Sequence, residues 1–389
     1  MEIALLGFGT VGRSVYEMLT AARTPELEQI RIKKILVRRD IPGIERFAVR
    51  DFSYILLDPS IDTVVEVMGG YSPAYDYVKK ALLCGKNVVT ANKAMLARFY
   101  GEITELSEKS GAALLFEASC AGGIPWIKNL RKAKQTDRIT RVGGILNGTA
   151  NYILDLAQSE GLEPEAALMR AQMKGFAEAD PSDDIDGIDT ARKIAISANL
   201  AFDICISEAS LLTAGIRNLS PVDIGFFKSR GLVCRLIAVA GKEPGGGVYA
   251  VTEPMLFKRS SPMASVPLNY NYAFLDGVSS GRLGFFGQGA GGPATANAIV
   301  QDLIEIAEGS AFKPVIKPFK IAPPPKKRYY IRAKRDIPAL WDLPGERIKA
   351  EENEIILTTP VNAADVHALK DSAASADIFF ASFAEDDFV

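Results

Sequence analysis

The feature that most constrains how this chain can fold is a glycine motif directly after an apolar segment near its start. A β-strand is predicted at Glu2–Leu6 and an apolar helix at Val11–Ala22, and the motif G-x-G-x-x-G joins them. In this context the first glycine permits a tight turn, the second lets a pyrophosphate approach the backbone, and the third lets helix and strand pack closely. A structural glycine turn is the alternative, but we expect a dinucleotide to bind at Gly7, Phe8, Gly9, Thr10, Val11 and Gly12.

Short β-rich runs alternate with helical runs through the first third of the chain, which is the pattern of parallel strands joined by crossover helices. Further strands are predicted at Arg31–Val37, Thr63–Met68, Asn87–Thr90 and Leu114–Glu117. Helices are predicted at Pro73–Cys84 and Tyr100–Ser110. The expected fold class is therefore α/β, with a Rossmann-type doubly wound parallel sheet.

The alternation ends near Pro125, and a second domain of the α+β class is expected beyond it. Its predicted helices are Asn151–Gln158, Pro164–Lys174, Ile188–Ala201 and Ser207–Ala214. Its predicted strands are Arg141–Leu146, Val233–Ala240 and Ala250–Thr252. A glycine-rich run at Gly287–Gly292 then precedes a helix predicted at Pro293–Ala307, which we expect to return to the first domain.

The last seventy or so residues have the composition of a linker followed by a small module. Prolines cluster between Pro314 and Pro325, and a basic run follows them. Strands at Tyr329–Ala333, Arg347–Ala350, Glu354–Thr359 and Asp377–Ala381, with helices near Ala339 and at Ala363–Ala374, would form a βαββαβ unit. The predicted domains are thus 1–125 joined by 290–317, then 126–289, then 318–389 with the linker.

Size and charge limit the class of partner. The 389 residues are more than a domain with a single hydrophobic core usually contains. The 45 basic and 47 acidic residues give a net charge of −2. No global charge favours nucleic acid or an anionic membrane, so a small-molecule partner is expected. We expect a cytoplasmic location, because the sequence shows no signal peptide and no apolar run of the roughly 18 residues that a membrane span needs.

Histidine is nearly absent, and this limits the chemistry. His367 is the single histidine, so proton transfer in the first 366 residues must use Lys, Asp, Glu, Tyr or Cys. A Ser-His-Asp or Cys-His hydrolase is excluded there. The four cysteines are scattered without a C-x-x-C pair, which argues against a zinc site and a disulfide framework.

Two arginines follow the second predicted strand. The residue type at this position usually distinguishes proteins that bind NADP from those that bind NAD. A carboxylate at that strand end binds ribose hydroxyls, whereas arginine accommodates a 2′-phosphate. Here Arg38 and Arg39 come first and Asp40 only third. The order favours NADP over NAD, and two solvated loop arginines are the alternative.

A lysine lies at the end of another predicted parallel strand. The strand at Asn87–Thr90 delivers Asn92 and Lys93 to its carboxyl end, which is the edge of an open parallel sheet where ligands bind. This position favours a functional role for Lys93 over that of a surface charge.

The densest signal is the acidic segment between Gly175 and Lys193. Six carboxylates fall within twelve residues, and the segment ends in a helix that places Asp189 and Lys193 four residues apart on one face. A calcium loop is excluded, because the acidic spacing does not fit and a lysine stands where the pattern requires glutamate. From spacing alone, an exposed ion pair of about 0.3–0.5 kcal/mol is an equal alternative.

Taken together, the ordered segments resemble the homoserine dehydrogenase family over roughly residues 1–317. The resemblance rests on the glycine motif, on the acidic segment and on four further segments. These are VVTANK at 88–93, FEASCAGGIP at 116–125, ILNGTANYIL at 145–154 and GQGAGG at 287–292. Several motifs in one order are more specific than any single one.

The resemblance implies reversible reduction of L-aspartate 4-semialdehyde to L-homoserine by NAD(P)H, in the biosynthesis of threonine, isoleucine and methionine. It assigns proton transfer to Lys193, a second cation to Lys93, and either orientation of the lysine or proton relay to Asp189. It assigns substrate binding to Glu178, Asp184, Asn147, Gly148 and Thr149, although a cap or strand role suits Thr149 equally. It adds Lys93, Gly287 and Gly289 to the residues that bind the cofactor.

The resemblance also implies a monovalent-cation site, an assembly and a regulatory module. Glu117 and the carbonyls of Cys120, Gly122 and Ile124 would hold sodium, with a structural turn as the alternative. The second domain would bind substrate and form a homodimer or homotetramer. The C-terminal module resembles an ACT module that senses threonine, but Asp336–Ala339 replaces the usual glycine signature.

Two rival functions remain open from the sequence. One is another semialdehyde or amino-acid dehydrogenase on the same scaffold. The other is a non-catalytic NADP-binding regulator, against which Glu178, Asp189 and Lys193 count, because a binding module needs no proton donor.

Overall fold

The chain is described by a computed structural model that covers residues 1–21, 24–310, 312–334, 340, 342–350, 352–371 and 378–384. It divides into two compact units. Unit 1 comprises Met1–Asp137, Ile196–Ser207 and Gln288–Pro318, and unit 2 comprises Arg138–Ala195, Glu208–Gly287 and Phe319–Val389. The three domains expected from the sequence stay a prediction.

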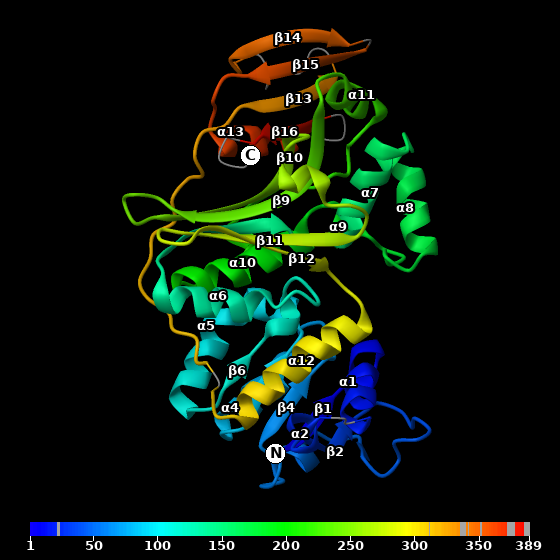
Figure 1. Cartoon of the computed structure of the whole chain (residues 1–389), viewed down its shortest axis with the longest axis vertical. Coiled ribbons are helices and arrows are strands. Elements are labelled where there is room, and N and C mark those ends of the chain that lie inside the picture. Colours follow the sequence, from blue (N-terminus) through cyan, green and yellow to red (C-terminus); the bar gives the residue numbers. More distant parts are fainter. Residues whose placement is uncertain are drawn as a thin grey trace. The chain divides into compact units, whose positions relative to one another are not determined.

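Unit 1 is built on a parallel sheet with the strand order β3-β2-β1-β4-β5-β6 (Figure 1). The strands are β1 (Glu2–Leu6), β2 (Arg31–Leu36), β3 (Ala48–Val49), β4 (Thr63–Glu66), β5 (Asn87–Thr90) and β6 (Leu114–Leu115). Every neighbouring pair runs parallel. This order confirms the doubly wound sheet. From β1 the chain adds β2 and β3 on one side of the sheet, and then β4, β5 and β6 on the other.

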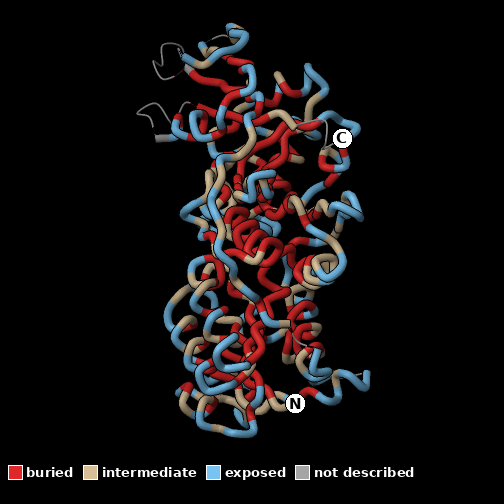
Figure 2. The backbone as a smooth tube through the Cα atoms, turned by 90° about the vertical axis from the view of Figure 1, so that its left-hand side faces the viewer, coloured by how far each residue is buried: buried red, intermediate tan, exposed pale blue. Residues whose placement is uncertain are grey.

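Helices cover the apolar faces of this sheet. α1 (Thr10–Thr20) and α12 (Gly292–Ala307) contribute Val15 and Ile299 to a core that includes Leu5 and Val65. α4 (Ala74–Leu83), α5 (Lys93–Ser110) and α6 (Trp126–Thr136) belong to the same unit. Figure 2 colours the buried residues red and the exposed residues pale blue. The central strands β1, β4 and β5 are buried over most of their length, as expected for parallel strands with helices on both faces.

Unit 2 is built on a second, mixed sheet with the order β12-β11-β7-β9-β10-β16-β13-β15-β14. Its first strands are β7 (Ile139–Ile145), β9 (Leu232–Lys242), β10 (Val248–Lys258), β11 (Tyr270–Gly277) and β12 (Gly281–Gln288). The helices α7 (Gly148–Ser159), α8 (Pro164–Met173), α9 (Ser182–Ile185), α11 (Pro221–Ser229) and the start of α10 (Ile188–Phe202) belong here. The α+β class expected for this region is confirmed.

The C-terminal module continues the same sheet. It contains β13 (Tyr329–Lys334), β14 (Gly345–Ala350), β15 (Asn353–Thr358), α13 (Ala363–His367) and β16 (Phe379–Phe383). The order β16-β13-β15-β14 places the module's fourth strand beside its first, and β16 pairs in parallel with β10. This arrangement fits a βαββαβ unit. The helix predicted near Ala339, and the Asp336–Ala339 signature with it, lie outside the described residues.

Several predicted elements differ from the structure. The helix predicted at Ser207–Ala214 is wrong, because a 3₁₀ turn at Glu208–Ser210 leads into β8 (Leu212–Thr213), whose backbone pairs with β10. The helix predicted from Tyr100 begins at Lys93 instead and has a non-helical residue at Phe99, which interrupts its periodicity. Of the helix predicted at Ala363–Ala374, the residues Ala363–His367 are α-helical, and a 3₁₀ helix follows at Ala368–Asp371.

The sequence did not predict several elements. Among them are α2 (Pro25–Glu28), β3, α3 (Ser53–Leu56), α6, α11, β11, β12 and the first two residues of β14. Among the described helices, none combines the length and apolar character that a bilayer crossing requires.

Candidate active site

The glycine motif forms the turn between β1 and α1 in unit 1. Gly7 has φ +102°, a value that glycine adopts at little cost, and its amide donates a hydrogen bond to the carbonyl of Leu36 at 3.1 Å. A Cβ on Gly12 would lie 2.5 Å from the carbonyl oxygen of Gly7, so helix and strand touch there. A Cβ on Gly9 would meet nothing within 4 Å, which leaves its backbone open to a ligand.

The residues between these glycines have unequal exposure. Thr10 is exposed at the first turn of α1, whereas Phe8 packs edge-on against Tyr16 with ring centroids 5.5 Å apart. Val11 packs against the apolar core of unit 1. Arg38 and Arg39 follow the end of β2 and are both exposed. The turn therefore fits a pyrophosphate at the backbone of Gly9 and Thr10, with the two arginines beyond the neighbouring strand.

An acidic side chain that the sequence analysis missed lies at the carboxyl end of β4. Glu66 is fully buried and accepts hydrogen bonds from the Thr90 hydroxyl at 2.7 Å and the Met68 amide at 2.8 Å. Burial raises the pKa of the Glu66 carboxyl, although these hydrogen bonds oppose the shift. The available signal was an acidic residue that ends an apolar strand, Val64-Val65-Glu66.

Asn92 and Lys93 lie beside Glu66 at the same sheet edge. The Asn92 side chain caps α5 by accepting from the Met95 amide at 3.1 Å, and its amide donates to the Gly70 carbonyl at 2.7 Å. Lys93 is the first residue of α5 and is half-buried. The structure therefore confirms that β5 delivers this lysine to the carboxyl edge of the sheet.

The predicted cation turn begins with a buried carboxylate. Glu117 is 2% exposed, and its oxygens accept from the backbone amides of Ile127 at 2.9 Å and Lys128 at 2.6 Å. Burial raises the pKa of Glu117 to about 7. In this structure the carboxylate thus caps the first turn of α6, and each oxygen retains a lone pair beyond its amide bond.

The rest of this turn is tightly packed. Cys120 and Ile124 are buried, and Gly122 has φ +59°. A Cβ on Gly122 would lie 2.4 Å from the carbonyl carbon and oxygen of Gly289. The late glycine run therefore packs directly on the predicted cation turn, which explains glycine at 122. Gly287 precedes it in β12 and is half-buried. No group of three or more His, Cys, Asp or Glu suited to a metal occurs among the described residues.

Four polar side chains converge in unit 2. The Lys193 Nζ lies 2.8 Å from Asp189 Oδ2 and donates to the Leu146 carbonyl at 2.7 Å. The Asn147 Nδ2 donates to Asp184 Oδ1 at 2.6 Å and to Asp189 Oδ2 at 2.8 Å. Lys193 is 8% exposed and Asp189 is 2% exposed. The alternative of a solvated surface ion pair is therefore wrong.

Two helix starts hold this cluster. Asn147 is the N-cap of α7, where its Oδ1 accepts from the Ala150 amide at 2.7 Å. Asp189 and Lys193 lie one turn apart at the start of α10. Burial, and then repulsion from Asp189, raise the pKa of Asp184, while the hydrogen bond from Asn147 opposes the shift. The cluster is thus a buried ammonium group with two carboxylates, one of which, Asp184, has a raised pKa.

The other predicted substrate residues make different contacts. The Thr149 hydroxyl donates to the Phe176 carbonyl at 2.7 Å, which ties α7 to the acidic segment, and it also opposes the rise in the pKa of Asp184. A Cβ on Gly148 would lie 2.7 Å from the Asn269 carbonyl oxygen, so close packing requires glycine there. The Glu178 side chain is exposed, outside the hydrogen-bonded cluster.

Comparison with protein-family models gives two matches. A model described as homoserine dehydrogenase matches residues 125–304. A second model, described as homoserine dehydrogenase, NAD binding domain, matches residues 7–117.

Known proteins of similar sequence and structure carry the same description. A homoserine dehydrogenase from Synechocystis sp. is 40% identical over 316 residues, which span 79% of this chain and 73% of the relative. The crystal structure of a homoserine dehydrogenase from Thiobacillus denitrificans has a TM-score of 0.87 at 28% identity, covering 99% of this chain and 98% of that one. A hyperthermophilic archaeal homoserine dehydrogenase in complex with NADPH has a TM-score of 0.67 at 25% identity, covering 79% and 98%.

Proposed function

The chain belongs to the homoserine dehydrogenase family, and on that premise we propose which of its residues carry the reaction. It is an NAD(P)-dependent oxidoreductase that reversibly reduces L-aspartate 4-semialdehyde to L-homoserine. This is a step in the biosynthesis of threonine, isoleucine and methionine. When bound, the nicotinamide cofactor supplies the hydride in reduction and accepts it in oxidation.

Lys193 is the proposed proton donor to the aldehyde oxygen, and in the reverse direction it takes the proton from the hydroxyl. The observation that carries this role is its buried amine, held 2.8 Å from Asp189 Oδ2 and 2.7 Å from the Leu146 carbonyl. A positioned acid typically contributes about 10²–10⁴-fold to the rate. Asp189 would orient the amine, and Asn147 would hold Asp189 in place through its amide.

Substrate binding is proposed for Glu178, Asp184, Asn147, Gly148 and Thr149. The exposed Glu178 carboxylate suits the ammonium group of the amino-acid substrate, and Asp184 adds a second carboxylate beside the proton donor. Gly148 and Thr149 would act through packing and through the bond to Phe176, which keeps the acidic segment against α7. Lys93 belongs to unit 1, so its role as a second cation rests on the family resemblance.

NADP is the proposed preferred cofactor, with NAD as the alternative. The open backbone at Gly9 and the helix start at Thr10 suit the pyrophosphate of either dinucleotide, and the exposed arginines after β2 support NADP. Gly7 and Gly12 would shape the turn, and Phe8 and Val11 would stiffen it by packing. The late glycines Gly287 and Gly289 are proposed to line the same cofactor site.

Sodium is the proposed monovalent cation, held by Glu117 and by the carbonyls of Cys120, Gly122 and Ile124. A monovalent ion needs little anionic charge, so one carboxylate with carbonyl oxygens is a suitable hard-ligand set. A sodium-specific rise in melting temperature, measured against choline chloride at equal ionic strength, is expected. An identical melting temperature in the two salts would leave the turn with its structural role only.

A homodimer, or a homotetramer built from it, is the proposed assembly. β12 exposes apolar side chains at the edge of the unit 2 sheet, where Leu283 is 40% and Phe286 is 55% exposed. Phe286 stacks on Tyr270 with ring centroids 5.0 Å apart, which extends the apolar surface. Light scattering after size-exclusion chromatography tests this proposal, and a monomeric mass would reject it. The cytoplasmic location stays a prediction.

The C-terminal module is proposed to be an ACT-like sensor of threonine. A cavity of about 470 Å³ lies in unit 2. Its wall includes Asp186 of the acidic segment, Arg217, and Lys370 and Phe379 of the C-terminal module. The Arg217 guanidinium binds Asp186 through two hydrogen bonds of 2.6 and 2.7 Å. A zwitterionic amino acid needs one cation and one anion, and the wall contains both kinds of charge, in the Arg217–Asp186 pair and in Lys370.

One assay tests the overall function. Oxidation of L-homoserine is followed spectrophotometrically with NADP and then NAD, each with and without threonine. Turnover with NADP exceeding that with NAD is expected, and threonine should lower it. Turnover of other aldehydes with none of homoserine would favour a different dehydrogenase, and cofactor binding without any turnover would favour a non-catalytic regulator.

A further inference from the structure

A second, smaller cavity lies in unit 2, away from the residues assigned to catalysis. Its volume is about 140 Å³, and its wall includes Asp155, Gln158 and Ser159 from α7, Lys228 from α11, Arg235 from β9, and Arg259. Pockets for drug-sized ligands usually measure roughly 300–1,000 Å³. A cavity of this size suits a single small ion or one charged group.

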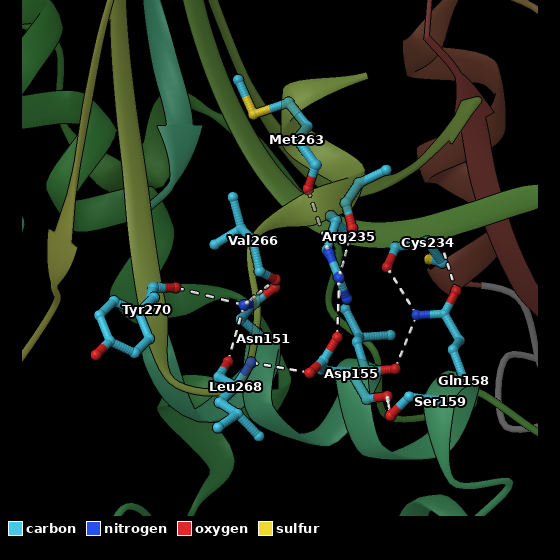
Figure 3. Close-up of polar contacts among 12 residues, drawn as sticks. Asn151, Asp155, Gln158, Ser159, Cys234, Arg235, Met263, Val266, Leu268 and Tyr270 are labelled. Atoms are coloured by element: carbon cyan, nitrogen blue, oxygen red, sulfur yellow. Dashed lines mark hydrogen bonds and ion pairs between the residues drawn. The ribbon is translucent and has the colours of Figure 1, made fainter. Parts of the chain in front are cut away.

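The wall contains a buried arginine whose donors are only partly used. Arg235 is 2% exposed, and its Nη2 donates to Asp155 Oδ1 at 3.0 Å and to the Ala264 carbonyl at 2.9 Å (Figure 3). Its Nη1 is buried and has no hydrogen-bond partner among the described residues. Leaving such a donor unsatisfied is costly, so the guanidinium keeps hydrogen-bonding capacity that the described residues do not use.

The fold fixes Arg235 in place from both sides. Asp155 accepts from the Leu268 amide at 2.9 Å with the oxygen that does not bind Arg235, so both carboxylate oxygens are engaged. Gln158 forms two hydrogen bonds with the backbone of Cys234, at 2.7 and 3.0 Å, and so ties α7 to β9 (Figure 3). The guanidinium is therefore preorganised and does not need to be ordered by a ligand.

The charges around the cavity are unbalanced. Arg235, Lys228 and Arg259 supply three cations, whereas Asp155 is the one carboxylate among the residues of the wall. Lys228 and Arg259 are exposed, so their side chains can turn toward a ligand. Burial lowers the pKa of Arg235, and a neighbouring anion would offset that cost.

We propose that this cavity binds a small oxyanion, a phosphate or carboxylate group, between the Arg235 guanidinium in its wall and the rim cations Lys228 and Arg259. Guanidinium groups bind such anions through charge-assisted hydrogen bonds, which are roughly twice as strong as neutral ones. The site is separate from the Lys193 cluster, since none of that cluster's side chains lines the cavity.

The test uses the full chain saturated with NADP, so that phosphate cannot act through the nucleotide site. Melting temperature is measured against inorganic phosphate, acetate and chloride at equal ionic strength. Phosphate or acetate is expected to give a saturable rise, and whichever acts at the lower concentration identifies the class of anion. The absence of a saturable rise with both would overturn the proposal.

Matched variants separate this site from general charge effects. Lys228→Ala and Arg259→Ala remove rim cations, while Arg230→Ala and Lys258→Ala remove exposed cations next to them that do not line the cavity. The first two should weaken the apparent anion affinity at least about tenfold, the usual size for a hydrogen bond to a charged group. Equal affinity in all four variants would also overturn the proposal.

Discussion

The Nζ of Lys193 lies 2.8 Å from Oδ2 of Asp189, one helical turn earlier in α10, in a part of unit 2 that water barely reaches. On the surface, a pair four residues apart is worth about 0.3–0.5 kcal/mol. Here the carboxylate also accepts from Asn147, and the amine also donates to the Leu146 carbonyl. The pair is therefore held at one geometry, as a proton donor requires, and does not merely add surface charge.

Removing the amine tests the central assignment. Lys193→Ala is expected to lower kcat by at least about two orders of magnitude, the size associated with a positioned acid, while nucleotide affinity changes little. Lys193→Met keeps most of the side-chain volume and should lose as much activity. Lys174→Ala, at an exposed lysine, serves as the control. A kcat near the wild-type value would move the acid elsewhere, with Lys93 as the first suspect.

The amide of Asn147 provides a second test, because it donates to Asp184 and Asp189 at once. Asn147→Asp preserves the α7 cap, since aspartate is an equally good N-cap. It replaces the shared donor with a third carboxylate, which should raise the pKa of Asp184 further. We expect kcat to fall at least about tenfold, with a shifted pH–rate profile. An unchanged profile at unchanged melting temperature would reject the positioning role.

The sequence predicts what depends on local pattern. The turn at Gly7–Gly12 and the delivery of Lys93 by β5 follow from strand, turn and helix signals over a few residues, and the structure confirms both placements. Asn147 contacts Asp184 and Asp189 across about 40 residues of chain, and no local sequence pattern predicts these contacts. β8 was mistaken for helix because its pairing with β10, nearly 40 residues later, overrides its helical composition.

The exposed carboxylate of Glu178 tests substrate binding. Glu178→Gln is expected to raise the KM for L-homoserine about tenfold or more, because the ammonium group of the substrate would lose a charge-assisted contact. kcat should change less, since the residue lies outside the Lys193 cluster. Glu165→Gln removes an exposed carboxylate from α8 and should leave KM unaltered. A KM unchanged by Glu178→Gln would end its assignment to the substrate.

The arginine after β2 tests the choice of cofactor. Arg38→Asp should weaken NADP binding at least about tenfold more than NAD binding, because the new carboxylate repels a 2′-phosphate and can accept from ribose hydroxyls. Arg31→Asp places the same charge change at the opposite end of the strand and is the matched control. Binding is measured by quenching of protein fluorescence with each nucleotide. Equal losses for the two nucleotides would contradict the 2′-phosphate assignment.

A buried carboxylate links the C-terminal module to the rest of unit 2. Glu253 of β10 lies 3.3 Å from the Lys327 Nζ and 2.9 Å from the His367 Nε2, and it accepts from the Tyr329 hydroxyl at 3.1 Å. Burial alone would raise the pKa of Glu253, but Lys327 and His367 outweigh it and lower the pKa to about 2. Ionised Glu253 therefore stabilises the fold.

The stabilisation by ionised Glu253 should be lost at low pH. Because the folded pKa of about 2 lies below the ordinary 4.5, the contribution is complete above pH 4.5 and is lost as pH falls from 4.5 through 2. Glu253→Gln should lower the free energy of unfolding at pH 7 by about 3 kcal/mol, since it leaves Lys327 buried without its carboxylate. The difference between wild type and variant should shrink steadily as the pH is lowered through this window.

Denaturant unfolding at a series of pH values from 7 to 2 measures this difference, with tyrosine and tryptophan fluorescence as the signal. Glu354→Gln is the control, because its ion pair with Arg347 in the same module is partly exposed at 2.9 Å and should contribute less than about 1 kcal/mol. A difference between wild type and Glu253→Gln that stays constant from pH 7 to 2 would show that the carboxylate acts through packing and not through its charge.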